Sequence, residues 1–65
     1  MFNRLDALMK QNRVTQAQLA QCTGKTERSI RNKLTGRQDF TVKEARAIRD
    51  CFFPEETLDA LFEEV

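Results

Sequence analysis

Hydrophobic residues recur along the chain at the three- and four-residue spacing of amphipathic helices, and no segment has the alternation typical of strands. The first such segment predicts a helix that begins at a cap, Asn3, and ends near Asn12. Its apolar residues are Phe2, Leu5, Leu8 and Met9. Helical signals of this kind occur five times, so the sequence predicts an all-α protein with five helices.

Two short helices joined by a tight turn are predicted next. Thr15 and Gln18 form the capping-box pattern that opens a helix. Gly24 favours a left-handed turn conformation after this second helix. Thr26 then caps a third helix, which Gly36 ends. The large apolar residues of the third helix are Ile30 and Leu34.

The C-terminal part of the chain predicts two more helices. Thr41 and Glu44 repeat the capping-box pattern and open the fourth helix. Its apolar stripe consists of Val42, Ala45, Ile48 and Phe52. Pro54 suits a first helical position, so a last helix is predicted from Pro54 through Phe62. Because no repeat or interdomain linker is found, residues 1–65 are expected to form a single domain.

Length and composition restrict the classes of site that the chain can form. A domain of 65 residues is near the lower size at which a core is buried unaided, so a deep enclosed pocket is not expected. The chain has no histidine, and Cys22 and Cys51 lie far apart without a CxxC pair, so the sequence predicts no metal site and no cofactor. We interpret both cysteines as reduced thiols with small apolar or surface roles and not as redox sensors, since neither lies in a recognisable redox pair. No apolar run is long enough to cross a bilayer, so a cytoplasmic protein without a membrane partner is expected.

Catalysis is not indicated by the residues present. The chain has no histidine or tyrosine, and its one serine, Ser29, has no activating base in reach by sequence. The carboxylates gather in the C-terminal third, where helix capping and solubility are sufficient roles for them. We therefore expect neither an enzyme nor a small-molecule ligand.

The distribution of charge is more informative than the net charge of +1. Residues 1–38 hold eight Lys or Arg residues and two acidic residues, which gives a net charge of +6. Residues 39–65 hold three Lys or Arg residues and eight acidic residues, which gives a net charge of −5. A dipolar domain of this kind can present its basic end to a polyanion while its acidic end points away. The alternative is that both charged runs are solvated helix faces.

The segment TQAQLAQCTGKTERSI, followed by LTG and DFTVKEARAI, resembles the phage repressor and Cro-type helix-turn-helix family, the lambda-repressor-like class. The residues that carry the resemblance are Gln16, Leu19, Ala20, Gly24 and Ile30. It covers nearly the whole chain and implies a compact five-helix domain in which the second and third helices form the helix-turn-helix. Two positions depart from the family pattern: Lys33 stands where an apolar residue is usual, and Thr23 replaces a common aliphatic residue.

The resemblance also implies which residues meet DNA, because the third helix of the family lies in the major groove. The expected base-contacting residues are Thr26, Glu27, Arg28, Arg31 and Asn32. Arginine can bond guanine bidentately, asparagine can pair with adenine, and glutamate can accept from a cytosine amino group. The expected phosphate-contacting residues are Thr15, Gln16, Lys25, Lys33 and Arg37.

Structural alternatives remain open for several of these residues. Glu27 is also suited to the positive end of the helix dipole, and it can pair with Arg31 at the i, i+4 spacing. Lys25 and Lys33 can serve as solubilising charges alone. Arg28 has no partner at a favoured spacing, which makes it the strongest candidate for reading a base.

Family members commonly bind two-fold operators as homodimers, so the resemblance implies a homodimer on DNA. The expected interface residues are Phe53, Leu58, Leu61, Phe62 and Val65. The competing interpretation is that Leu58, Leu61 and Phe62 close the core of the monomer. The function implied is that of a sequence-specific transcriptional regulator, a repressor of the bacterial cytosol or nucleoid that a phage or its host encodes. The alternative is a protein-interaction module built on the same scaffold, such as an antitoxin, an anti-repressor or an assembly factor.

Overall fold

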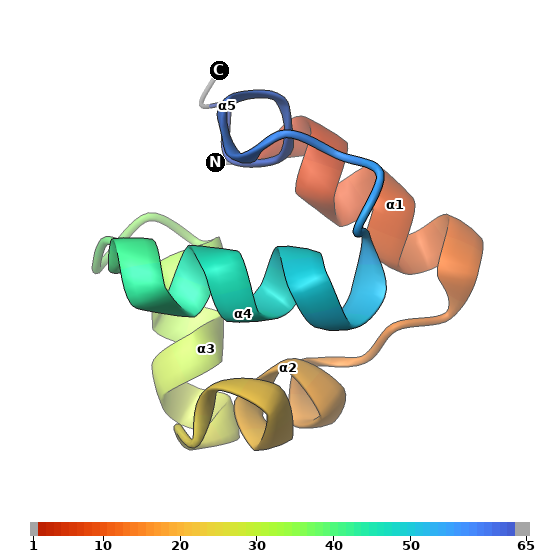
Figure 1. Ribbon diagram of the computed structural model, residues 1–65. Helices are drawn as coiled ribbons and strands as arrows, with labels where there is room; N and C mark the ends of the chain where they lie inside the picture. Colours follow the sequence, from red (N-terminus) through yellow and green to blue (C-terminus); the bar gives the residue numbers. More distant parts are fainter. Residues whose placement is uncertain (1, 64–65) are drawn as a thin grey trace.

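Five helices and no strand are found in residues 2–63, the part of the chain that the computed structural model describes (Figure 1). The helices are α1 (Asn3–Asn12), α2 (Gln16–Thr23), α3 (Glu27–Leu34), α4 (Val42–Phe52) and α5 (Leu58–Leu61). The predicted all-α class with five helices is therefore confirmed. In Figure 1, α4 crosses the middle of the molecule, with α2 on one side of it and α1 and α5 on the other.

Each helix contributes one fully buried aliphatic side chain to the core. These residues are Leu5, Leu19, Ile30, Ile48 and Leu61, in the order of the helices. Burying one such side chain stabilises a protein by roughly 1.5–3 kcal/mol. Because the core is shared in this way, none of the five helices buries its apolar face without the others.

The two capping boxes predicted from the sequence are both present. The Gln18 backbone N–H donates to Thr15 Oγ1 at 3.2 Å, and the Thr15 N–H donates to Gln18 Oε1 at 2.8 Å. At the start of α4, the Glu44 N–H donates to Thr41 Oγ1 at 3.1 Å, and the Thr41 N–H donates to Glu44 Oε1 at 2.9 Å. Both helices therefore begin where their local sequence predicts.

The first helix begins one residue earlier than predicted, and the last helix begins later. Phe2, without a side-chain hydrogen bond, occupies the cap position of α1, so Asn3 is the first helical residue and not the cap. Pro54 lies in a turn and not in a helix. The cap of α5 is Thr57, whose hydroxyl accepts from the Ala60 N–H at 3.1 Å. This side-chain acceptor favours a helix start at Leu58, which leaves α5 with four residues.

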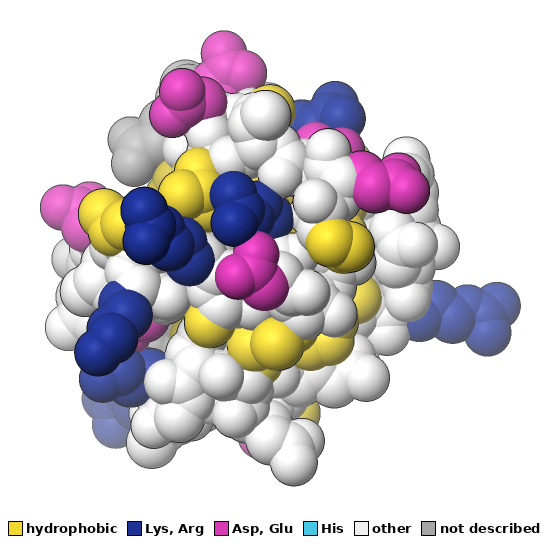
Figure 2. All heavy atoms as spheres, viewed as in Figure 1, with side chains coloured by type: hydrophobic (Ala, Val, Ile, Leu, Met, Phe, Trp, Pro, Cys, Tyr) yellow, Lys and Arg dark blue, Asp and Glu magenta, His cyan; other side chains and the backbone are white. Residues whose placement is uncertain are grey.

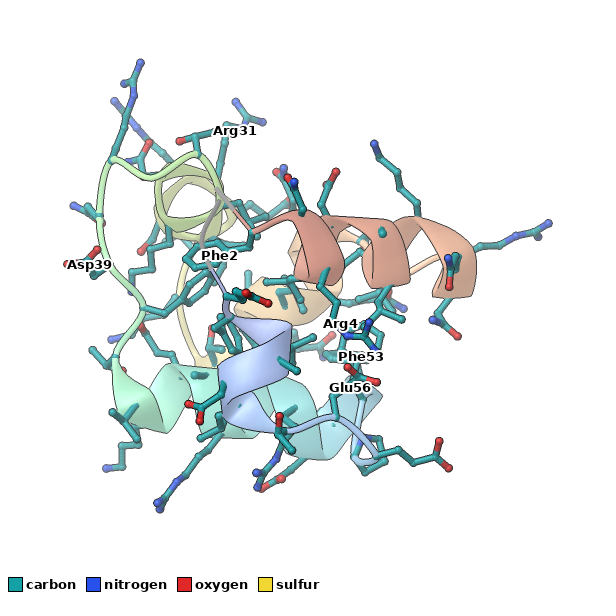
Figure 3. The ribbon with its side chains drawn as sticks, turned by 90° about the horizontal axis from the view of Figure 1, so that it is seen from above. Phe2, Arg4, Arg31, Asp39, Phe53 and Glu56 are labelled. Atoms are coloured by element: carbon teal, nitrogen blue, oxygen red, sulfur yellow. The ribbon has the colours of Figure 1, made fainter. Side chains whose placement is uncertain are left out.

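The turn before α5 is fixed by an ion pair with α1. Arg4 and Glu56 lie side by side in Figure 3. Arg4 Nε donates to Glu56 Oε1, and Arg4 Nη2 donates to Glu56 Oε2 at 3.1 Å. The hydrogen bond and charge of Arg4 hold the pKa of Glu56 below its usual range, although partial desolvation acts to raise it. This pair thus connects the two ends of the domain.

Three aromatic rings join the first residues, the α3–α4 loop and the end of α5. Phe2, Phe40 and Phe62 pack edge to face, with ring centroids 5.2–5.7 Å apart. Such pairs contribute about 0.5–1.5 kcal/mol beyond the area that they bury. The cluster thus joins three segments that are distant from one another in the sequence.

The residues expected at a dimer interface divide into three groups. Phe53 and Leu61 are 5% and 0% exposed, so the expectation that they form a dimer surface is wrong, because the monomer core already contains them. Leu58 and Phe62 are half-buried and keep part of their surface accessible. Val65 lies outside the described residues.

Candidate nucleic-acid interface

A tight turn at Gly24 joins α2 to α3, and the two helices pack on each other. Gly24 has φ 71° and ψ 23°, the left-handed conformation that glycine adopts at low cost. The backbone N–H groups of Gly24 and Lys25 both donate to the Ala20 carbonyl, the second at 3.0 Å. The helix-turn-helix predicted from the sequence is therefore present as a structural unit.

Thr23, which directly precedes the turn glycine, is accommodated without an unpaired polar group. Its hydroxyl donates back to the Leu19 carbonyl at 2.9 Å, one turn earlier in α2. The side chain is half-buried at the end of the helix. Local hydrogen bonding of this kind is common for threonine in a last helical turn.

Lys33 on α3 faces the interior and not the solvent. It is 8% exposed, and its Nζ forms an ion pair with Oε2 of Glu44 on α4, which is 5% exposed. The prediction that Lys33 contacts phosphate is therefore wrong. Lys33 occupies an inward position of α3, and the buried carboxylate of Glu44 compensates its charge.

The carboxyl group of Glu44 is held in its charged form. Burial acts to raise the pKa of this group, but the hydrogen bond from Lys33, the bonds from Thr41 and the charge of Lys33 together lower the pKa below its usual value. One carboxylate oxygen accepts from Lys33, and the other accepts from the Thr41 N–H at 2.9 Å. Glu44 thus links the start of α4 to the inner face of α3.

The outer face of α3 is exposed and polar. Its cap is Thr26, whose hydroxyl accepts from the Ser29 N–H at 3.1 Å. Four of the five predicted base-contacting residues are exposed, namely Thr26, Glu27, Arg28 and Arg31. In Figure 3 the labelled Arg31 side chain points away from the body of the protein. The fifth residue, Asn32, is half-buried.

The loop after α3 folds back on the end of that helix. The backbone N–H groups of Arg37 and Gln38 donate to the Asn32 carbonyl, at 2.9 and 3.3 Å. These bonds place both residues beside the C-terminal end of α3, where their side chains are exposed. Sequence reasoning missed Gln38, because only this return of the chain places it there.

The phosphate-contacting residues predicted at the start of α2 lie near the same region. Gln16 is half-buried and lines a shallow groove together with Leu34 and Thr35 at the end of α3. Thr15 is exposed, and its hydroxyl already accepts the capping bond from Gln18. The N-terminus of α2 and the C-terminal end of α3 are therefore neighbours.

Four cations on and around α3 are exposed. They are Lys25, Arg28, Arg31 and Arg37, and we refer to them as the basic face. The ion pairs found within residues 2–63 are Arg4–Glu56, Asp6–Lys10, Lys33–Glu44 and Arg49–Asp50. None of these involves the basic face, and Glu27 and Arg31 do not pair with each other. The charges of the basic face thus remain directed at the solvent.

Within the part of the chain that the structure describes, no group of three or more His, Cys, Asp or Glu side chains is placed to hold a metal ion. Across the same residues, no helix combines the length and apolar character needed to span a membrane. Comparisons with protein-family models, with curated proteins and with solved structures find no match to this chain.

Proposed function

We propose that the protein is a sequence-specific double-stranded DNA-binding regulator, which inserts α3 into the major groove of an operator. The observation that carries this proposal is the basic face. Ile30 and Lys33 anchor one side of α3 in the protein, whereas the opposite side presents cations that no carboxylate within residues 2–63 neutralises. The width of the major groove suits a helix exposed in this way.

The side chains of this face have the chemistry for reading bases. Arg28 lies in the first turn of α3, and Arg31 follows it by one turn. Each can form two hydrogen bonds with O6 and N7 of a guanine, and each such pair discriminates against other bases by roughly 1–3 kcal/mol. Because Glu27 and Arg31 are not paired with each other, both are free to meet base edges in this proposal.

Phosphate contacts fit on either side of α3. The N-terminus of α2, with Thr15 and Gln16, offers backbone N–H groups and the positive end of a helix dipole. Lys25 lies in the turn between the helices, and Arg37 follows the C-terminal end of α3. Lys33 is not part of this set, because it is buried in its pair with Glu44.

A homodimer that occupies a two-fold operator and excludes RNA polymerase is the simplest form of this regulator. Leu58 and Phe62, the accessible members of the expected interface, line an open groove with Phe40 and Val42. Val42 is 66% exposed and adds accessible apolar surface to this groove. Action as a repressor in the bacterial cytosol or nucleoid, whether encoded by a phage or by its host, belongs to the same proposal.

Selection of bound sites from a random DNA pool, followed by fluorescence anisotropy on the selected site, tests the proposal. We expect Arg28→Ala to weaken binding to the selected site about 10- to 100-fold while binding to random DNA changes little. Log affinity should fall with log salt at a slope of about 0.9 for each phosphate neutralised. Arg46→Ala, which removes an exposed arginine on α4, is the matched control.

Failure to enrich any site at low salt would refute the proposal, and so would an unchanged sequence preference in Arg28→Ala. The protein-interaction module remains the other candidate for this scaffold. It would require an apolar patch on α3, whereas the exposed residues of this helix are polar or charged. We therefore favour DNA as the partner.

A further inference from the structure

The two cysteines, which are distant in the sequence, lie against each other in the fold. Cys22 in the last turn of α2 and Cys51 near the end of α4 have their Sγ atoms 2.8 Å apart, and both are free thiols. Cys22 also donates to the Ala47 carbonyl at 3.2 Å, which orients its sulfur toward α4. A disulfide has an S–S distance of about 2.05 Å, so a small approach of the two side chains would close one.

The pair is accessible to small reagents. Cys51 is exposed and Cys22 is half-buried. A shallow groove lined by both cysteines and by residues of α2 and α4 opens over them. Figure 2 shows a band of hydrophobic side chains between these two helices. An oxidant can therefore reach the sulfur atoms without opening the core.

We propose that Cys22 and Cys51 form a redox-modification site, a dithiol that closes reversibly to an intramolecular disulfide between α2 and α4. The oxidant is a small hydroperoxide, and the overall reaction converts two thiols and one H₂O₂ into one disulfide and two water molecules. A dithiol reductant reverses it by exchange through a mixed disulfide. The proposal is independent of DNA binding.

The two sulfur atoms have different roles in this reaction. The exposed Cys51 thiolate attacks a peroxide oxygen, which breaks the O–O bond, gives a sulfenic acid and releases hydroxide. Burial, the hydrogen bond with Cys51 and the negative charges of Cys51 and Asp50 raise the pKa of Cys22 to about 11. Cys22 therefore stays a thiol while Cys51 is reduced. As the Cys22 sulfur attacks the sulfur of the Cys51 sulfenic acid, its proton passes to the displaced hydroxide, which leaves as the second water molecule.

Closing the disulfide constrains the unfolded chain, because the cross-link encloses the turn, the whole of α3 and most of α4. Loop-closure entropy for about 30 residues, combined with the melting entropy of a small domain, corresponds to a rise in Tm of about 10 °C or more. Since α2 already packs on α4, the helices need not move apart or rotate to form the bond. The oxidised protein is expected to be more stable and to keep the same fold.

The test uses the full chain, treated with hydrogen peroxide and then with iodoacetamide, and examined by intact mass spectrometry and thermal unfolding. We expect a monomer that has lost two hydrogen atoms, carries no alkyl group and melts about 10 °C or more above the reduced protein, with dithiothreitol reversing both changes. Cys22→Ala and Cys51→Ala should each show no oxidative rise in Tm. Circular dichroism before oxidation identifies a variant that fails to fold, and the other variant then serves as the control.

Three results would overturn the proposal. One is a protein that still carries two alkyl groups after treatment. Another is sulfinic acid at Cys51 with Cys22 still alkylated. The third is disulfide-linked dimers in place of the oxidised monomer. None of these measurements involves DNA, so they do not depend on the outcome of the operator experiments.

Discussion

Replacing Glu44 by glutamine would leave the Lys33 ammonium buried between α3 and α4 without a countercharge. The side chains of this pair are only 9% and 6% exposed, so water cannot take the place of the lost carboxylate. Breaking a buried ion pair costs about 3–5 kcal/mol, whereas a domain of this length has a total stability of roughly 3–10 kcal/mol. Glu44→Gln should therefore lose most of the free energy of unfolding.

Glutamine is the appropriate replacement because it separates the ion pair from the helix cap. Its amide oxygen can still accept the bond that the Thr41 N–H now donates to Glu44 at 2.9 Å. Lys33→Met removes the buried cation, and the double variant removes both charges. If the two single effects were additive, they would predict a certain loss of stability for the double variant. We expect the double variant to be more stable than this prediction by at least about 2 kcal/mol.

Urea unfolding followed by circular dichroism at neutral pH measures the free energy of unfolding of the wild type, the two single variants and the double variant. A coupling free energy below about 0.5 kcal/mol would refute the reasoning, since additive effects are the rule for sites that do not interact. A Glu44→Gln variant as stable as the wild type would refute it as well. Either result would mean that Lys33 has an exposed conformation in solution.

The same pair predicts a dependence of stability on pH. Because the pKa of Glu44 is lowered in the folded protein, its contribution is complete above the unfolded carboxyl pKa of about 4.3 and is lost as pH falls through the folded value. The wild type should therefore lose stability below about pH 4 more steeply than Glu44→Gln, which lacks this contribution at every pH. Urea midpoints measured between neutral and acidic pH test this difference.

Two further substitutions test the turn and the aromatic cluster. Gly24→Ala should lower the free energy of unfolding in urea by about 1–2 kcal/mol, because nothing lies within 4 Å of the added Cβ and only the left-handed backbone is strained. Gly36→Ala, at a glycine with φ 89°, is the comparison. An unchanged urea midpoint in Gly24→Ala would contradict the turn geometry. Phe2→Ala should lower the free energy of unfolding by about 3–5 kcal/mol, because the Phe2 ring is buried and meets two other rings edge to face. A loss below about 1 kcal/mol in the same assay would show that the cluster does not hold the first residues in place.

The parts of the fold that were predictable depend on signals within about four residues of one another. Thr15 and Gln18, like Thr41 and Glu44, are three positions apart, so their hydrogen bonds form wherever the helix begins. Gly24 acts through its own backbone angles. The exposed face of α3 follows from helical periodicity once Ile30 is assigned to the core.

The start of the last helix shows where local signals compete. Pro54 and Thr57 are both acceptable near a helix N-terminus, and the sequence does not rank them. In the fold, the Glu56 N–H donates to the Phe53 carbonyl at 3.0 Å, and the Glu56 side chain pairs with Arg4. These contacts hold Glu56 in the turn, and the helix begins after Thr57.

The sequence by itself determined the five helices, the caps of α2, α3 and α4, the turn at Gly24 and, apart from Lys33, the outward basic residues of α3, because each depends on neighbours along the chain. Only the tertiary structure decided that Lys33 is buried and that Cys22 meets Cys51. The partners in these two pairs are 11 and 29 positions apart, and each lies on a different helix. No periodicity or spacing reports such contacts, because the packing of α4 against the helix-turn-helix brings the partners together.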